Sequence, residues 1–369
     1  MTGKERLLTA IKGGRPDRMP ISTQMWHPHH LRTVMGGMGE VEAYLHVGFD
    51  VMAEPYQVEQ LAASPDWIEH REVIADSPNG KTIRISIETL KGRLTHTLFE
   101  SNITAYTTEH LIKTERDAEL FLQYYPSKTI DKQQLSKVYD LVGDHGIVRG
   151  LVPWCVQPGP WQEFCELVGM EKAIFWTLDD PQFVHHFLDR MTQYKVDNIH
   201  KQLSGAKFDL FENGGAAASS NVISPTIFDE FCVPYDRQIN QALHEEGFLV
   251  AYHTCGAMMA ILTHIPANGC DASETLTPRC SGGDIESEDD RRTVKRVLGS
   301  QVSLIGGMGQ NLLEQPNSPQ VEAQIAAHVH TCFEAFGAGG GYICSSGQFL
   351  QAPPENLKAC ARAAAQCIY

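Results

Sequence analysis

The sequence predicts an α/β protein of the (β/α)8 TIM-barrel class, and two observations lead to that class. Short apolar runs that end in glycine, serine or polar residues recur eight times along the 369 residues. Stretches of helical periodicity separate most of these runs, as in proteins with a parallel sheet. No GxGxxG segment opens a helix after the first run, which argues against an open dinucleotide-binding sheet. We therefore expect residues 1–369 to form a single barrel domain.

The eight predicted strands are short and apolar in their interiors. They are Arg18–Thr23, Asp50–Glu54, Gly146–Val152, Phe208–Glu212, Phe248–His253, Cys270–Thr275, Val302–Gly306 and Gly341–Ser345.

Four long amphipathic stretches between these runs predict helices. Two of them begin with Ser-Pro, at 224–225 and 318–319, which supplies an N-cap followed by proline at the first helical position. The four are Gly169–Leu178, Asp180–Leu203, Ser224–Glu246 and Ser318–Phe336.

One stretch breaks the strand–helix alternation. Residues 80–106 alternate apolar and polar side chains on both sides of Lys91-Gly92, a pattern typical of a β-hairpin. We expect this hairpin to be inserted into an early connection of the barrel and to cover part of its mouth.

The charge balance excludes some partners. Thirty basic and 45 acidic residues give a net charge of −15, which would repel nucleic acid and anionic membranes. No apolar run reaches the roughly 18 to 20 residues needed to span a bilayer. The first 18 residues are charged and amphipathic, so we expect a helix of a cytoplasmic protein. Ten scattered cysteines fit free thiols in a reducing compartment, most of them buried.

Reactive side chains stand where predicted strands end, and a TIM barrel gathers the carboxyl ends of its strands at one face. The fifth strand ends in His253 and Cys255, the sixth in Glu274 and the eighth in Cys344. Residues i and i+2 of a strand project from the same face, so His253 and Cys255 can reach one ion. Two thiolates and one imidazole select zinc, and three protein ligands leave a position open for substrate. Alone, however, a His-x-Cys pair is weak evidence for a metal.

Three segments carry a resemblance to a known family. KERLLTAIKGGRPDRMP resembles its N-terminal helix and first strand, and DLFENGGAAASSNVISPTIFDEFCVPY resembles its ISP…F…PY segment. LVAYHTCG followed by YICSSG resembles a His-x-Cys…Cys zinc motif. The family is the uroporphyrinogen decarboxylase superfamily, and the last motif is similar to its zinc-dependent corrinoid methyltransferase branch. Decarboxylases of this family carry an arginine-rich signature. Here the matching STQMWHPHHLRTVMG has Arg32 alone, which disfavours binding of an octacarboxylate.

The resemblance implies a site, residue by residue. His253, Cys255 and Cys344 would bind zinc, and Glu274 would occupy the fourth position until substrate displaces it. Glu212, at the end of the fourth strand, is a second catalytic candidate, although it also fits a structural carboxylate.

Two directions of methyl transfer follow from the resemblance. In the favoured one, a small methylated substrate such as an aryl methyl ether gives its methyl group to the cobalt of a corrinoid. Trp26, His27 and Trp154 are the candidate substrate contacts, although each also fits ordinary packing. In the alternative, a thiol of the coenzyme M type accepts the methyl group. A tetrapyrrole decarboxylase-like enzyme and a non-catalytic corrinoid-binding barrel remain further alternatives.

The corrinoid (cobalamin) is expected on a separate protein, because the chain has no DxHxxG stretch. Gly307, Gly309 and Gly340 stand in glycine-rich segments that would allow close approach of the macrocycle. The same glycines also fit an ordinary helix end and strand entry. The oligomeric state stays open between a monomer and a homodimer.

Overall fold

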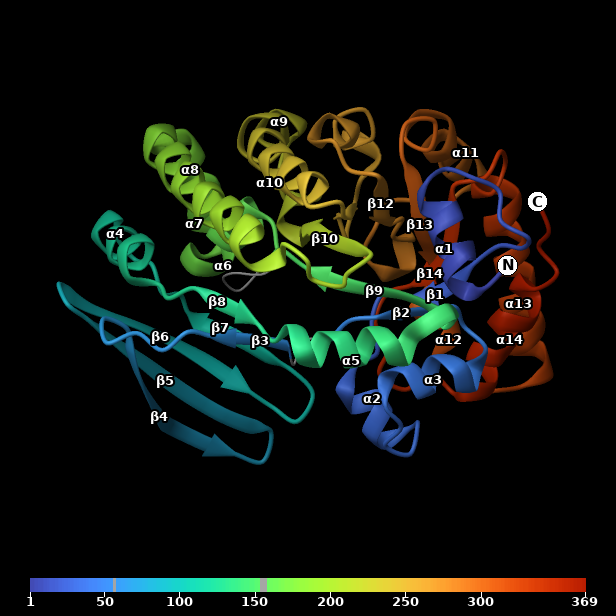
Figure 1. Ribbon diagram of the computed structural model, residues 1–369, viewed down its shortest axis with the longest axis horizontal. Helices are drawn as coiled ribbons and strands as arrows, with labels where there is room; N and C mark the ends of the chain where they lie inside the picture. Colours follow the sequence, from blue (N-terminus) through green and yellow to red (C-terminus); the bar gives the residue numbers. More distant parts are fainter. Residues whose placement is uncertain (56–57, 153–157) are drawn as a thin grey trace.

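The computed structural model describes residues 1–55, 58–152 and 158–369. Its centre is an eight-stranded parallel sheet with the order β1-β14-β13-β12-β11-β10-β9-β2 (Figure 1). All eight strands coincide with the strands predicted from the sequence, to within a few residues at their ends. They are β1 (Ile21–Thr23), β2 (Val51–Ala53), β9 (Gly146–Leu151), β10 (Leu210–Gly214), β11 (Leu249–His253), β12 (Ala272–Thr275), β13 (Ser303–Met308) and β14 (Tyr342–Ser346).

The sheet closes between its first and last strands, which confirms the predicted (β/α)8 barrel. The Asp50 amide donates to the carbonyl of Ile21 at 2.8 Å, and the Ser22 hydroxyl donates to the carbonyl of Asp50 at 2.9 Å. The Asp50 carboxylate is buried and accepts hydrogen bonds from both Arg6 and Arg18. These two arginines therefore neutralise the one acidic side chain that joins β1 to β2.

Helices surround the barrel, and most of them connect consecutive strands (Figure 1). The first, α1 (Gly3–Ile11), lies instead across the amino ends of the strands, where the Ser303 hydroxyl bonds the carbonyls of Ala10 and Ile11. The others are α2 (Pro28–Thr33), α3 (Glu40–Val47), α4 (Glu115–Tyr124), α5 (Lys132–Val142), α6 (Pro160–Val168), α7 (Met170–Asp179), α8 (Pro181–Asn198), α9 (Pro225–Phe231), α10 (Val233–Glu245), α11 (Glu288–Val297), α12 (Gln310–Leu313), α13 (Pro319–Phe336) and α14 (Pro354–Ala364).

The helix boundaries follow the sequence signals in three of the four predicted cases. Ser224 and Ser318 are N-caps, since their side chains accept from the third amide of α9 and of α13. The predicted helix Ser224–Glu246, by contrast, is two helices that break at Cys232. The break is explained by Pro234, which cannot donate a backbone hydrogen bond in the interior of a continuous helix.

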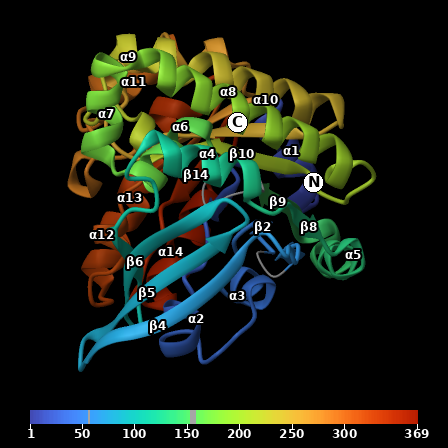
Figure 2. The same cartoon turned by 90° about the vertical axis from the view of Figure 1, so that its left-hand side faces the viewer.

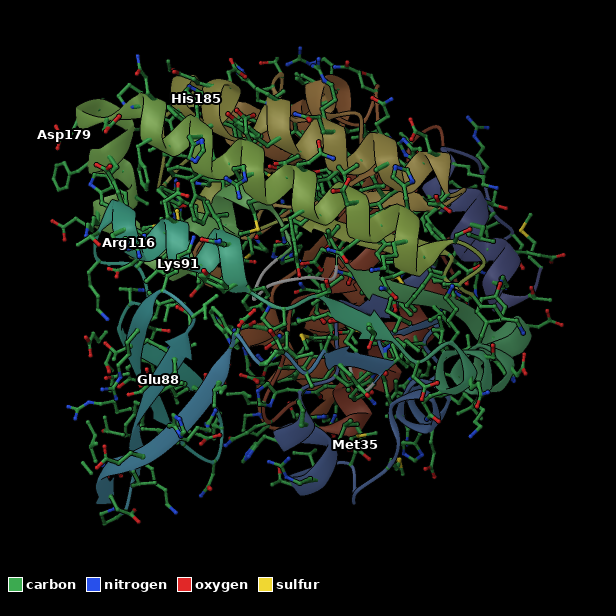
Figure 3. The ribbon with its side chains drawn as sticks, turned by 60° about the vertical axis from the view of Figure 1, so that its left-hand side comes forward. Met35, Glu88, Lys91, Arg116, Asp179 and His185 are labelled. Atoms are coloured by element: carbon green, nitrogen blue, oxygen red, sulfur yellow. The ribbon has the colours of Figure 1, made fainter. Side chains whose placement is uncertain are left out.

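The insertion after β2 is larger than the predicted hairpin. The hairpin itself is β5 (Gly80–Thr89) and β6 (Gly92–Glu100), and β4 (Ile68–Ser77) and β7 (Ala105–Glu109) flank it in a four-stranded antiparallel sheet. This sheet forms a layer of its own below α4 in Figure 2. Arg116 of α4 donates to the carbonyl of Lys91 at the hairpin turn (Figure 3). A second small sheet pairs β3 (Glu59–Leu61) with β8 (Lys128–Ile130).

The insertion lies beyond the carboxyl ends of the barrel strands. The arrow of β9 points toward the side on which β4–β7 lie (Figure 1), and the chain enters the insertion directly from the carboxyl end of β2. None of the described helices is long and apolar enough to cross a membrane.

Candidate metal and active site

The carboxyl ends of β10, β11 and β12 bring an imidazole between two carboxylates. His253 is the last residue of β11 and pairs in register with Glu274 of β12. Its Nδ1 lies 2.9 Å from Oε1 of Glu274 and 3.7 Å from Oε1 of Glu212 on β10. All three side chains are buried, and their ligand atoms lie within 4.8 Å of one another. In the part of the chain that the structure describes, this is the one cluster with the spacing of a metal site.

A buried arginine completes the cluster, and sequence reasoning missed it. Arg149 stands in the middle of β9 and is 0% exposed. Its Nη1 and Nη2 donate to the two oxygens of Glu274 at 2.9 and 2.8 Å, and Nη2 also bonds Glu212. Glu54, after β2, lies 3.8 Å from its Nε. The signal was present, because an arginine inside an apolar strand such as GIVRGL is rarely buried without acidic partners.

The charges within the cluster shift the pKa values of its members in opposite directions. Burial alone would raise the pKa of Glu274, but Arg149 and His253 outweigh burial and lower it to about 2. Burial alone would lower the pKa of His253, yet Cys255 and Glu274 together raise it to about 10. Glu274 is therefore a carboxylate at neutral pH, and as a carboxylate it can only accept hydrogen bonds.

Cys255 follows β11 and is exposed at the mouth of the barrel. Burial around its sulfur would raise the thiol pKa, but His253 outweighs this and lowers it. A lowered pKa favours the thiolate, which is the form that attacks carbon and binds metals. His253 and Cys255 therefore interact at the end of β11, but the sulfur is not part of the 4.8 Å cluster, and their joint role as zinc ligands stays a prediction.

The structure does not bring Cys344 to this site. Cys344 of β14 is 0% exposed, and burial together with Cys332 and Cys360 on the outer helices raises its pKa well above the usual value. Tyr342, two residues earlier and so on the same face of the strand, packs on Phe336 of α13 with ring centroids 5.3 Å apart. Cys344 therefore faces the helical layer, and the expectation that it is the third zinc ligand is corrected. All nine cysteines within the described residues are free thiols.

A cavity of about 350 Å³ opens beside His253 and Cys255. Most of its other side chains are amides and hydroxyls. Among the residues described, the lining includes no phenylalanine, tyrosine or tryptophan and no lysine or arginine. The lining is Gln24, His253, Cys255, Thr275, Thr277, Pro278, Ser281, Met308, Gln310, Gly347 and Gln348.

Comparison with known proteins agrees with this barrel. The family model of uroporphyrinogen decarboxylase (URO-D) matches residues 107–367, which is 261 of the 369 residues. The chain belongs to the uroporphyrinogen decarboxylase family.

One curated relative and one solved structure of similar fold are methyltransferases. A methylated-thiol–coenzyme M methyltransferase of Methanosarcina mazei is 26% identical over 197 residues, or 53% of this chain. The match spans about half (48%) of that curated relative. The solved structure of a methyltransferase from Methanosarcina mazei matches with a TM-score of 0.66 at 17% identity, over 99% of each chain. The resemblance to the methyltransferase branch is thus confirmed as a likeness of sequence and of fold.

Two of the three candidate substrate contacts, Trp26 and His27, are not among the residues that line the cavity. Trp26 is 4% exposed and packs edge-to-face on Tyr44 and Phe349, so it belongs to the core, and its expected substrate role is corrected. His27 caps α2, where its Nδ1 accepts from the amide of His29, and it does not line the cavity. Trp154 lies outside the described residues.

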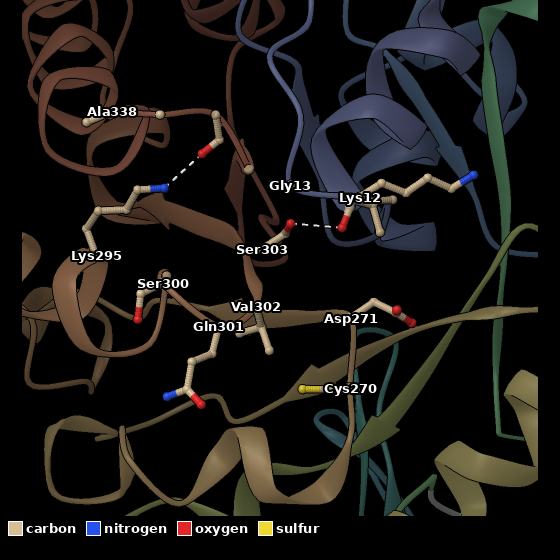
Figure 4. A pocket seen from close by; sticks show the side chains of 15 residues that line it. Lys12, Gly13, Cys270, Asp271, Lys295, Ser300, Gln301, Val302, Ser303 and Ala338 are labelled. Carbon is tan, nitrogen blue, oxygen red and sulfur yellow. Dashed lines mark hydrogen bonds between the residues drawn. The ribbon is translucent and has the colours of Figure 1, made fainter.

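The three candidate corrinoid-facing glycines are at three different places. Gly309 stands at the mouth, directly before Gln310 of the cavity lining. A side chain at Gly307 would point at Tyr342 and Phe336, so this glycine faces the helical layer. Gly340 lines a different cavity, of about 590 Å³, at the amino ends of the strands, where Lys295 donates to its carbonyl (Figure 4). The structure therefore contradicts the expected contact of Gly307 and Gly340 with the corrinoid. Gly309 alone lies at the carboxyl end of the barrel, where that contact was expected.

Proposed function

We propose that this protein is a zinc-dependent methyltransferase that moves a methyl group between a small methylated substrate and the cobalt of a corrinoid on a separate protein. The observation that carries the proposal is the pair of His253 and Cys255 beside a cavity at the carboxyl end of the barrel. The imidazole lowers the pKa of the thiol next to it. The family membership and the two methyltransferase relatives support the same reading.

The donor set fits zinc. An imidazole and a thiol of lowered pKa are borderline and soft donors, and the carboxylate of Glu212 lies near the imidazole. His253 and Cys255 would hold the ion, with Glu212 and Glu274 adjacent. When bound, zinc supplies Lewis acidity that lowers the pKa of a substrate thiol or stabilises a leaving heteroatom.

The cavity favours a small polar sulfur compound over an aryl methyl ether. Its volume of about 350 Å³ and its amides from Gln24, Gln310 and Gln348 suit a small substrate with hydrogen-bond acceptors. The aryl ether favoured from the sequence finds no aromatic wall among the lining residues that the structure describes. The relative from Methanosarcina mazei acts on methylated thiols and coenzyme M, which agrees with this choice.

The transfer balances with the groups at hand. The substrate S–H bond breaks, an S–CH3 bond forms, and the Co–CH3 bond breaks with its electron pair left on cobalt. The thiol proton is released to solvent through the cavity that opens beside His253 and Cys255. The reverse direction forms Co–CH3 from a methylated thiol and returns the proton to the thiolate.

The corrinoid partner would meet the barrel mouth beside Gly309. A side chain added there would lie 3.0 Å from the sulfur of Cys280. Glycine avoids this close contact and leaves the backbone accessible at the mouth. The insertion of β4–β7 lies on the same side of the barrel and would border the docking surface (Figure 1).

A methyl-transfer assay tests the proposal. Zinc-loaded protein is mixed with methylcobalamin and coenzyme M, and in separate reactions cob(I)alamin is mixed with methylated thiols, aryl methyl ethers or methylamines. The visible spectrum of the cobalamin reports the transfer. We expect turnover with the sulfur compounds, and we expect Cys255→Ser to lose it. Cys280→Ser is the matched control, because Cys280 is the other exposed thiol among the described cysteines. Equal turnover by Cys255→Ser and the wild type would refute the proposal.

A further inference from the structure

The arrangement around Arg149 determines what Glu274 can do. Arg149 is 0% exposed and forms a two-pronged pair with Glu274, in which each carboxylate oxygen accepts one N–H at 2.8–2.9 Å. Such bidentate pairs are the strongest and most directional ion pairs that side chains form. If Glu274 turned away, a fully buried guanidinium would lose two of its hydrogen bonds.

We propose that Arg149 is a positioning residue that holds Glu274 outside the metal's coordination, so that Glu274 orients His253 instead of binding the ion. This inference rests on the proposed function. It replaces the expectation that Glu274 occupies the fourth ligand position until substrate arrives.

The direction of each hydrogen bond supports this role. Arginine can only donate, so both oxygens of Glu274 are acceptors. Oε1 of Glu274 also lies 2.9 Å from Nδ1 of His253, and an acceptor there requires that Nδ1 carries its proton. The other ring nitrogen, Nε2, is then the one that can bind an ion, in exchange for the proton that it carries in the metal-free protein. A carboxylate that accepts from the distal N–H of a ligating histidine is the usual outer partner in zinc sites.

A second side chain, Gln24, competes with Glu274 for the hydrogen bond at Nδ1 of His253. The amide nitrogen of Gln24 lies 3.2 Å from the same Nδ1 and would need a bare lone pair there. The bond to Glu274 is shorter, and its acceptor is charged, and charge-assisted bonds are about twice as strong as neutral ones. We therefore assign the proton to Nδ1, which requires the Gln24 amide to present its oxygen instead of its nitrogen to the ring.

Glu212 differs from Glu274 in a way that gives a matched comparison. It bonds Arg149 through Oε2 alone, and its Oε1 lies 3.7 Å from His253. One oxygen of Glu212 is thus not engaged by the guanidinium, while both oxygens of Glu274 are. Glu212 therefore keeps one oxygen that could turn toward an ion, whereas Glu274 keeps none.

The test measures zinc affinity and zinc coordination in four proteins: wild type, Glu274→Gln, Glu212→Gln and Arg149→Lys. Affinity comes from competition with a chelator, and coordination comes from the zinc X-ray absorption edge. We expect Glu274→Gln to leave the first shell unchanged and to weaken binding about 10- to 100-fold, as loss of an outer partner does. We expect Glu212→Gln to alter the first shell. Arg149→Lys keeps the charge but loses the fork, so Glu274 is released and the first shell gains an oxygen.

Two results would overturn the inference: an oxygen lost from the first shell in Glu274→Gln, or a spectrum and an affinity of Arg149→Lys equal to those of the wild type. If Arg149→Lys fails to fold, the isosteric Glu274→Gln decides alone. Methyl transfer is measured on the same samples. Wild type that binds zinc as expected without any transfer refutes the proposed function and leaves the role of Arg149. Transfer combined with a first-shell oxygen lost in Glu274→Gln refutes the role of Arg149 and leaves the function.

Discussion

The two cysteines of the apparent zinc motif should behave in opposite ways when they are replaced. Cys255 is exposed, so Cys255→Ser should change the free energy of unfolding by no more than about 0.5 kcal/mol. It should nevertheless weaken zinc binding by more than about 100-fold, beyond the range seen when only an outer partner is lost. A serine hydroxyl keeps its proton at neutral pH and is a poor replacement for a thiolate.

Cys344→Ala should show the reverse. The side chain is 0% exposed among outer-layer residues, and removing a buried atom of this size costs about 1–2 kcal/mol once the cavity term is included. In a chain of 369 residues that corresponds to a fall of about 1–3 °C in Tm. Zinc affinity should stay within about twofold of the wild type, because the sulfur faces α13 and not His253.

The assay pairs competition against a chromophoric chelator with urea unfolding of the metal-free proteins. Cys280→Ser serves as the control for an exposed thiol. If Cys344→Ala weakened zinc binding as strongly as Cys255→Ser, the orientation of β14 described above would be wrong, and the three-ligand motif predicted from the sequence would be restored.

Three further substitutions test the fold. Burial raises the pKa of the Glu40 carboxyl from 4.5 to about 8, so the folded chain keeps a proton that the unfolded chain releases. The free energy of unfolding should therefore fall as pH rises from about 4.5 to 8. Glu40→Gln should flatten that fall in urea titrations. If the free energy of unfolding of Glu40→Gln fell with pH as steeply as that of the wild type, the raised pKa of Glu40 would be wrong. Asp50→Asn leaves Arg6 and Arg18 facing a neutral side chain where β1 meets β2. The free energy of unfolding, measured by thermal unfolding, should fall by about 3 kcal/mol. A fall below about 1 kcal/mol would contradict the role of Asp50 in closing the barrel. Gly306→Ala would place Cβ 1.6 Å from the carbonyl oxygen of Thr275, so no folded protein should accumulate, whereas Gly39→Ala has open space and should express normally.

The architecture was predictable because the local sequence of each barrel strand is enough to identify it. Each of the eight strands is a short apolar run followed by glycine or a polar residue, and that pattern needs no tertiary information. The extent of the insertion was not predictable in the same way. β4 is exposed along its whole length and has no apolar–polar contrast, so only the partly buried hairpin of β5 and β6 gave a signal.

The site was half predictable for a related reason. His253 and Cys255 lie at the end of one strand, and their spacing alone places them together. Cys344 failed because the sequence YICSS does not show which of its two faces points inward, and a shift of one residue exchanges the faces. Arg149 was missed because its partners come from β2, β10 and β12, a convergence that only the closed barrel creates.

The central claim is a zinc centre built on His253 and Cys255 at the carboxyl end of the barrel, without Cys344. Anomalous scattering at the zinc edge from crystals of the zinc-loaded protein tests it directly. The account predicts one peak, within bonding distance of an imidazole nitrogen of His253 and of the sulfur of Cys255. A peak bonded to Cys344, or none beside His253, would contradict it.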